Sequence, residues 1–162
     1  MPGIWLSLGS NIDRSRHIHS ALKVLGEEFG PLIVSPVYES EAVGFDGDAF
    51  YNLIVGIESD QPAESLMAGF RVIEVDHGRA RGSEKFSSRT LDIDLLTYGD
   101  CTLKQGKLEL PRDEILRYAF VLLPLSDVAG DEVHPLTGKC YRDLWEAFDR
   151  KKEQLLWRVS ID

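Results

Sequence analysis

The chain begins with an alternating pattern of apolar and polar positions and continues with a helical one. In GIWLSLGSN, residues 3–11, every second side chain is a large aliphatic one, which predicts a half-buried strand. Apolar residues then recur at helical spacing over residues 18–29, and a Gly-Pro pair at 30–31 predicts the end of that helix. Ser10 or Asn11 is expected to cap its start.

Two further strands and a second helix are expected next. LIVSPVYES, residues 32–40, is typical of a strand at an edge or with a bulge, because Pro36 donates no ladder hydrogen bond. The nearly continuous apolar run FYNLIVGIE, residues 50–58, predicts a central strand. Pro62 suits the first turn of a second helix, which is expected to end at the His-Gly pair at 77–78.

A polar loop and one more strand complete the core. The loop GRARGSEKFSS, residues 78–88, precedes LDIDLL, residues 91–96, whose apolar run also predicts a central strand. The order strand, helix, strand, strand, helix, strand is the split βαβ or ferredoxin-like pattern. We therefore expect an α+β fold, with an antiparallel sheet and helices mostly on one face.

The remainder is expected to form a C-terminal extension of the same domain. It contains the apolar segment AFVLLPL, residues 119–125, a turn region, and a helix from about Tyr141. No linker, internal repeat or low-complexity stretch divides the chain, so a single domain over residues 1–162 is predicted.

Composition narrows the classes of function. Eighteen basic and 27 acidic residues give a formal net charge of −9, which argues against nonspecific nucleic-acid binding. No apolar run approaches the ~18 residues needed to cross a bilayer, and no secretory signal is visible, so a cytoplasmic protein away from membranes is expected. Cys101 and Cys140 belong to no CxxC pair, and two free thiols are favoured over one disulfide.

Two acids interrupt the last core strand. Asp92 and Asp94 share one face of an extended chain, roughly 7 Å apart. They could be solvated at a sheet surface, but an unpaired ionised carboxylate in a central strand is expensive. A divalent cation would relieve their repulsion, and Mg²⁺ fits best because it takes one or two carboxylates together with substrate phosphates.

The loop before these acids supplies opposite charge. Arg79, Arg81, Lys85 and Arg89 lie within eleven residues, and guanidinium groups bind phosphate bidentately. A solvated basic loop is the alternative, but its position directly before the acid pair favours phosphoryl transfer. Walker A, HExxH and GxSxG motifs are absent from the sequence, and the four histidines have no zinc-ligand spacing.

Three segments carry a resemblance to a known family. LSLGSN, GRAR…SSRTLDIDLLTYGD and LPRDEILRYAFVLLPL resemble the 6-hydroxymethyl-7,8-dihydropterin pyrophosphokinases of folate biosynthesis, from Ile4 to about Trp145. The resemblance implies a ferredoxin-like monomer that transfers the β,γ-pyrophosphoryl group of ATP to the hydroxymethyl of a reduced pterin, leaving AMP. It also implies that Asp92 and Asp94 hold two Mg²⁺ ions around the triphosphate.

The resemblance assigns further roles by position. Arg79 and Arg89 match catalytic arginines that act on the phosphates. The positions implied to contact the nucleotide are Glu74, Arg81, Phe86, Arg112, Arg117 and Tyr118. The positions implied to bind the pterin are Ser40, Val43, Phe50, Asn52 and Phe120. Phe50 and Phe120 would stack on the pterin ring, although without the resemblance they would be expected in the core.

The chain departs from the family pattern around the expected site. SEAVG at 40–44 stands where TPPxG is common, and SSRTLD lacks the usual Gly-Pro before its arginine. Arg112 replaces a histidine, and Tyr118 replaces a phosphate-contacting arginine for which Arg117 is a candidate substitute. A drifted or non-catalytic paralogue that binds pterin or nucleotide is therefore the alternative. A ferredoxin-like RNA-binding module is disfavoured, because no RNP1-type aromatic strand or basic face is present.

Overall fold

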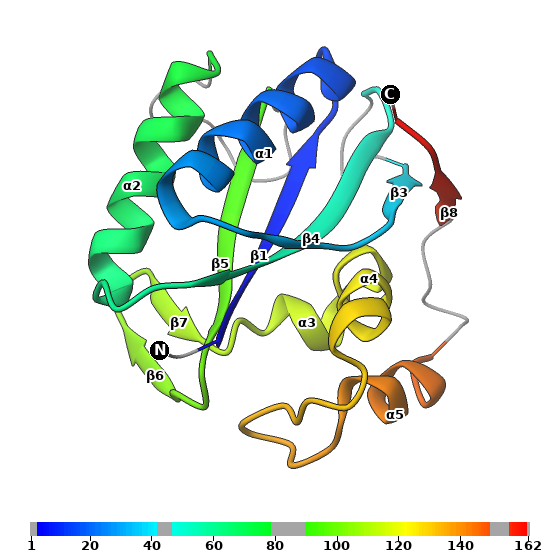
Figure 1. Cartoon of the computed structure of the whole chain (residues 1–162). Coiled ribbons are helices and arrows are strands. Elements are labelled where there is room, and N and C mark those ends of the chain that lie inside the picture. The colour runs from blue at the N-terminus through cyan, green and yellow to red at the C-terminus, as the bar shows by residue number, and fades with distance from the viewer. Residues whose placement is uncertain (1–2, 42–46, 79–89, 150–155, 162) are drawn as a thin grey trace.

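One antiparallel sheet runs through the centre of the molecule (Figure 1). The computed structural model describes residues 3–41, 47–78, 90–149 and 156–161. The sheet path runs in the order β5 (Asp92–Tyr98), β1 (Gly3–Ser10), β4 (Phe50–Glu58), β3 (Val37–Ser40) and β8 (Leu156–Val159), and β2 (Ile33–Val34) also pairs with β4. With α1 (Arg14–Phe29) and α2 (Ala63–Asp76) between strands, this arrangement confirms the ferredoxin-like α+β prediction.

Helices cover both faces of the sheet, so the expectation of helices mostly on one face is wrong. On one face α1 and α2 pack through Ile18, Leu25 and Phe70. The opposite face carries α3 (Glu114–Arg117), α4 (Ala119–Ala129) and α5 (Tyr141–Glu146), whose apolar residues pack on Trp5, Ile54 and Leu96 (Figure 1). Burial on both faces explains the unbroken apolar run of β4, because such a strand has no solvent-facing side on which polar residues would alternate with apolar ones.

The strand that carries the two acids lies at the end of the sheet path, which corrects the prediction of a central position. β5 pairs with β1 along one edge and packs against α2. Its apolar character comes from burial on both faces: Ile93 and Leu95 enter one core cluster, and Leu96 enters the other. The hydrophobicity of a strand's sequence indicates whether its two faces are buried, but it does not indicate whether another strand pairs along each edge.

Two local expectations also differ. The single strand expected over residues 32–40 divides into β2 and β3 around Ser35 and Pro36. Helix α1 starts after Asp13, a left-handed residue with φ of 50° and no side-chain capping bond. The expected caps have other partners: the Ser10 hydroxyl donates to the Thr90 carbonyl at 2.5 Å, and Asn11 donates to the Asp48 carbonyl.

The sequence patterns did not predict three short strands: β8 and the hairpin of β6 (Leu103–Gln105) and β7 (Leu108–Leu110). The apolar segment at 119–125 forms most of α4, and the expected C-terminal helix begins at Tyr141. Cys101 and Cys140 are free thiols, as predicted. Within the described ranges, no helix is both long and apolar enough to cross a bilayer.

Candidate active site

The two acids of β5 lie side by side on the face that carries α3 and α4. Asp92 and Asp94 are half-buried, and the residues beside them in the strand are fully buried, which confirms the predicted shared face. In the antiparallel register Gly9 of β1 pairs with Asp92, and Ser7 pairs with Asp94. The side chains beside the carboxylates are therefore small, which leaves room above them.

Helix α2 holds the outer edge of β5 at the residue between the acids. The buried carboxylate of Glu74 accepts a 2.7 Å hydrogen bond from the Ile93 backbone N–H and lies 3.0 Å from the guanidinium of Arg71. Arg71 in turn donates to the Ile93 carbonyl, and its Nη2 is 3.8 Å from Oδ1 of Asp94. Both backbone groups of Ile93 are thus satisfied at a sheet edge where none of the described strands pairs with them.

This contact changes the interpretation of Glu74. The residue was expected to contact the nucleotide, but it is 2% exposed and its two carboxylate oxygens engage Ile93 and Arg71. Its evident task is to position the acid-bearing strand, and a nucleotide contact stays a prediction. Sequence reasoning missed Arg71, although its position three residues before Glu74 on a helix was an available signal.

A bulge in β5 brings a second arginine to the acids. Leu6 pairs with Leu95 and Trp5 pairs with Thr97, so Leu96 is the extra residue. The Leu96 carbonyl accepts a 2.9 Å hydrogen bond from the backbone N–H of Arg112, which fixes this residue beside β5.

The side chain of Arg112 is bound by an acid that sequence reasoning did not single out. The guanidinium donates to the buried carboxylate of Glu114. Its Nε is buried and has no hydrogen-bond partner among the described residues. An unsatisfied donor of this kind suits an anion such as phosphate, as predicted for this position.

The electrostatics of the site favour a bound cation. Burial and the neighbouring charge of Asp92 raise the pKa of the Asp94 carboxyl to about 8, although Arg112 and Arg71 oppose the shift. Burial lowers the pKa of Arg112, but Asp94 and Glu114 outweigh it and raise that pKa overall. Ionising both acids therefore costs free energy, and a positive charge bound between them would reduce that cost.

The donor set agrees with Mg²⁺ in kind. No group of three or more His, Cys, Asp or Glu residues gathers as a metal site in the described part of the chain. Two carboxylates alone do not make a complete protein cage for a metal. They do fit Mg²⁺, which usually keeps water and takes its remaining oxygens from substrate phosphates.

Three of the residues predicted for pterin binding, Ser40, Phe50 and Asn52, lie together at the other end of the same face. The side-chain amide of Asn52 is buried and donates to the Ser40 hydroxyl at 2.7 Å. Gly9 lies between Asn52 and Asp92 in the paired register, so the three form one row across β4, β1 and β5. A Cβ on Gly9 would lie 3.5 Å from Asn52 Oδ1 and 3.7 Å from the Phe50 ring.

This row sets the distance between the two halves of the site. Two strand spacings separate the amide-bearing and acid-bearing positions, which is roughly 10 Å. Gly9 itself adds no side-chain atoms to the floor between them. Asn52 and the acids therefore lie close enough for two neighbouring ligands to meet above Gly9.

The remaining described candidates gather where α3 meets α4. The rings of Tyr118 and Phe120 stack with centroids 5.1 Å apart and planes 21° apart. The Arg117 guanidinium lies 5.4 Å from the centroid of the Tyr118 ring and donates to Asp113 at 3.0 Å in an exposed pair. Phe120 is half-buried on the face that also carries Asn52, so a role in stacking a ligand stays a prediction.

Five predicted residues lie outside the described ranges. They are Val43, Arg79, Arg81, Phe86 and Arg89. The described chain ends on either side of them at Glu41 and Gly47, and at Gly78 and Thr90. Their predicted roles therefore stay predictions.

The fold and the paired acids define a class, and comparison with known proteins gives its family. Residues 5–130 match the model of the 7,8-dihydro-6-hydroxymethylpterin-pyrophosphokinase (HPPK) family. The chain belongs to this family of pyrophosphokinases.

Curated relatives include both short and long proteins. The chain is 30% identical over 141 residues to the 2-amino-4-hydroxy-6-hydroxymethyldihydropteridine pyrophosphokinase of Aquifex aeolicus, covering 86% of this chain and 88% of that relative. It is 34% identical over 138 residues to the folic acid synthesis protein fol1 of Pneumocystis carinii, covering 83% of this chain. The chain spans only 18% of that longer relative.

The solved structures agree on the fold. The crystal structure of Plasmodium falciparum HPPK-DHPS with pteroate matches with a TM-score of 0.74 and 15% identity, over 89% of this chain and 42% of that one. At this identity the match supports the fold alone.

Proposed function

We propose that the chain transfers the pyrophosphoryl group of ATP to the hydroxymethyl group of 6-hydroxymethyl-7,8-dihydropterin. The substrate hydroxyl oxygen attacks the β-phosphorus of ATP and forms the new P–O bond. The bond from that phosphorus to the oxygen bridging to the α-phosphate breaks, AMP leaves with its electron pair, and the hydroxyl proton passes to solvent.

The observation that carries the proposal is the row Asn52, Gly9 and Asp92 across three neighbouring strands. An amide that can recognise the donor and acceptor edge of a pterin lies at one end. Carboxylates suited to a metal–triphosphate lie at the other. A ring bound at the amide could thereby present a reacting side arm to a nucleotide bound at the carboxylates.

The roles of individual residues follow from their positions. Asp92 and Asp94 would hold two Mg²⁺ ions. When bound, these supply the positive charge that offsets the triphosphate. Arg71 and Glu74 position β5, and Arg112 offers its buried Nε to a phosphate oxygen.

Roles outside the described residues are part of the same proposal. Arg79 and Arg89 would stabilise the transferring group, while Arg81 and Phe86 would contact the nucleotide. Val43 would complete the pterin pocket with Ser40, Phe50, Asn52 and Phe120. We further propose a monomer in the cytoplasm, as expected from the family resemblance and the sequence.

A pterin- or nucleotide-binding paralogue without transfer activity is a second candidate. One observation favours it: Glu114 binds the guanidinium of Arg112, which offsets positive charge where the triphosphate would lie. Such a protein would bind pterin but release no AMP.

The test follows the fate of the β-phosphorus. ATP labelled with ³²P at the β position is incubated with the pterin and Mg²⁺, and the products are separated. Pyrophosphoryl transfer predicts label in the pterin product and none in AMP. Label in ADP would contradict the proposal, because the γ-phosphorus would then have been attacked. Bound but unchanged pterin would favour the second candidate.

A further inference from the structure

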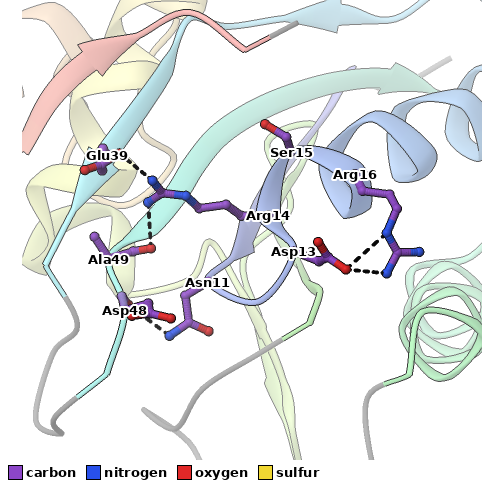
Figure 2. Close-up of a pocket in the computed structure, with 8 residues that line it drawn as sticks. All are labelled: Asn11, Asp13, Arg14, Ser15, Arg16, Glu39, Asp48 and Ala49. Carbon is purple, nitrogen blue, oxygen red and sulfur yellow. Dashed lines mark hydrogen bonds and ion pairs between the residues drawn. The ribbon is translucent and has the colours of Figure 1, made fainter.

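An open pocket lies where the N-terminus of α1 meets the segments on either side of residues 42–46 (Figure 2). Arg14, in the first turn of α1, extends across it toward β3 and the start of β4 (Figure 2). Its contacts reach both segments that flank residues 42–46.

The Arg14 side chain has three partners of different chemistry. Its Nη2 lies 3.0 Å from Oε2 of Glu39, and its Nη1 donates to the Ala49 carbonyl at 2.9 Å. The guanidinium carbon is 3.8 Å from the centroid of the Tyr51 ring. A separate hydrogen bond, from the Asn11 side chain to the Asp48 carbonyl at 3.0 Å, also joins the start of α1 to the segment before β4.

These partners adjoin the residues that the pterin is proposed to contact. Glu39 precedes Ser40 on β3, and Ala49 directly precedes Phe50, the first residue of β4. Ser40 and Phe50 are themselves partners in the β3–β4 register. An arginine that joins Glu39 to Ala49 therefore fixes the open end of this strand pair.

Such a fastening matters because Ser40 and Phe50 must be held in place for a ring to bind against them, and ordering them at the moment of binding would weaken the affinity. Holding Glu39 and Ala49 to α1 in advance lowers the part of that cost that ligand binding would otherwise bear.

We propose that Arg14 is a positioning residue for pterin binding: it joins both flanks of residues 42–46 to α1 and thereby holds Ser40 and Phe50 ready for the ring. This inference rests on the proposed function, because it assumes that these residues receive a pterin. The three partners need a planar group with several N–H donors, so lysine is a poor replacement.

The test measures binding of 6-hydroxymethylpterin and of a non-hydrolysable ATP analogue with Mg²⁺ by calorimetry. For Arg14→Gln we expect a pterin Kd about tenfold higher and an unchanged nucleotide Kd. In turnover, KM for the pterin should rise by a similar factor while kcat stays within twofold. Arg14→Lys should recover only part of the loss, because it restores the ion pair alone.

The same helix turn offers a matched control. Arg16 pairs with Asp13 at 2.7 Å, and both side chains are more than 60% exposed. Arg16→Gln should leave the pterin Kd unchanged. Equal pterin Kd values for Arg14→Gln and the wild type would overturn the inference.

Two further measurements separate the possible failures. Glu39→Gln removes the ion pair alone and keeps the other contacts of Arg14. It should therefore weaken pterin binding less than Arg14→Gln does. It should also stay folded, and it takes over the test if Arg14→Gln does not fold. Hydrogen exchange over residues 39–41 and 47–51 should be faster in the Arg14→Gln variant without any ligand. Unchanged exchange would overturn the inference, whereas a wild-type protein that binds no pterin would overturn the proposed function instead.

Discussion

The carboxylate of Glu74 accepts a 2.7 Å hydrogen bond from the backbone N–H of Ile93, the residue between Asp92 and Asp94. A side chain of α2 thereby takes the place of a neighbouring strand at the edge of the sheet. Arg71 completes the arrangement at the Ile93 carbonyl. Helix α2 thus fixes the acid pair through the backbone of Ile93. The side chains of Asp92 and Asp94 lie on the face of β5 opposite to the Ile93 side chain.

Removing this contact should weaken both the fold and the acid site. Glu74→Ala leaves the buried Ile93 N–H without its acceptor, which costs about 1–3 kcal/mol of unfolding free energy. Urea unfolding measures this change. Glu64→Ala, an exposed position on the same helix, is the control and should cost less than about 0.5 kcal/mol. Equal losses in the two variants would show that the Glu74 contact contributes nothing.

Asp94 should make the metal-free protein less stable as pH rises. Its pKa is about 8 in the folded state against 3.8 for the ordinary carboxyl, so the folded state binds the extra proton between these values. Stability from this group is therefore full near pH 4 and falls as pH rises through 8.

Thermal unfolding in the presence of chelator checks the sign. The Tm of Asp94→Asn minus that of the wild type should increase from pH 5 to pH 8, reaching at least about 3 °C. Added Mg²⁺ and ATP should raise the wild-type Tm and leave that of the variant nearly unchanged. A difference that shrinks with rising pH would contradict the assigned direction.

Glu114 should weaken nucleotide binding through Arg112. Replacing the carboxylate by an amide in Glu114→Gln removes a negative charge beside the guanidinium that we propose binds the triphosphate. We expect the Kd of Mg-ATP to fall roughly threefold to tenfold at low salt and less at high salt. Asp131→Asn, which removes a carboxylate from the exposed pair with Arg142 and touches no residue assigned to the site, is the control. Weaker binding by Glu114→Gln would instead mean that Glu114 presents Arg112 to the phosphate.

Gly9 should control access between the two halves of the site. A methyl group there would lie 3.5 Å from Asn52 Oδ1, an ordinary contact that the fold tolerates. Gly9→Ala should therefore keep its Tm within about 3 °C but raise KM for the pterin at least tenfold. Gly3→Ala, on the same strand with no atom near its new Cβ, should leave KM unchanged. Unaltered pterin kinetics in Gly9→Ala would contradict the row as the path of the substrate.

The sequence predicted those parts of the fold that depend on local periodicity. Alternation around Ile4 and Ile93, and helical spacing around Ile18 and Phe70, were enough to predict the order of the core elements. The edge position of β5 was not predictable in this way, because a helix that satisfies its backbone leaves the strand as apolar as a central one.

The residues of the candidate site likewise fall into those that local sequence predicts and those that depend on tertiary packing. The acid pair was predictable because two positions in one strand share a face whatever surrounds them. The ion pair of Arg71 with Glu74 had a signal in its helical spacing. The contact of Arg71 with Ile93 and the approach of Glu114 to the acids were not predictable, since they depend on how α2 and the chain after β7 pack against β5. Arg14 was missed for the same reason: its partners lie 25 and 35 residues away along the chain.

The most direct test of the proposed reaction is AMP release from ATP, measured with and without 6-hydroxymethyl-7,8-dihydropterin and with Mg²⁺ present or chelated. The account predicts AMP only when pterin and Mg²⁺ are both present, and none from Asp94→Ala even though that variant still binds pterin. AMP release by the wild type that does not depend on the pterin, or ADP as the product, would contradict it.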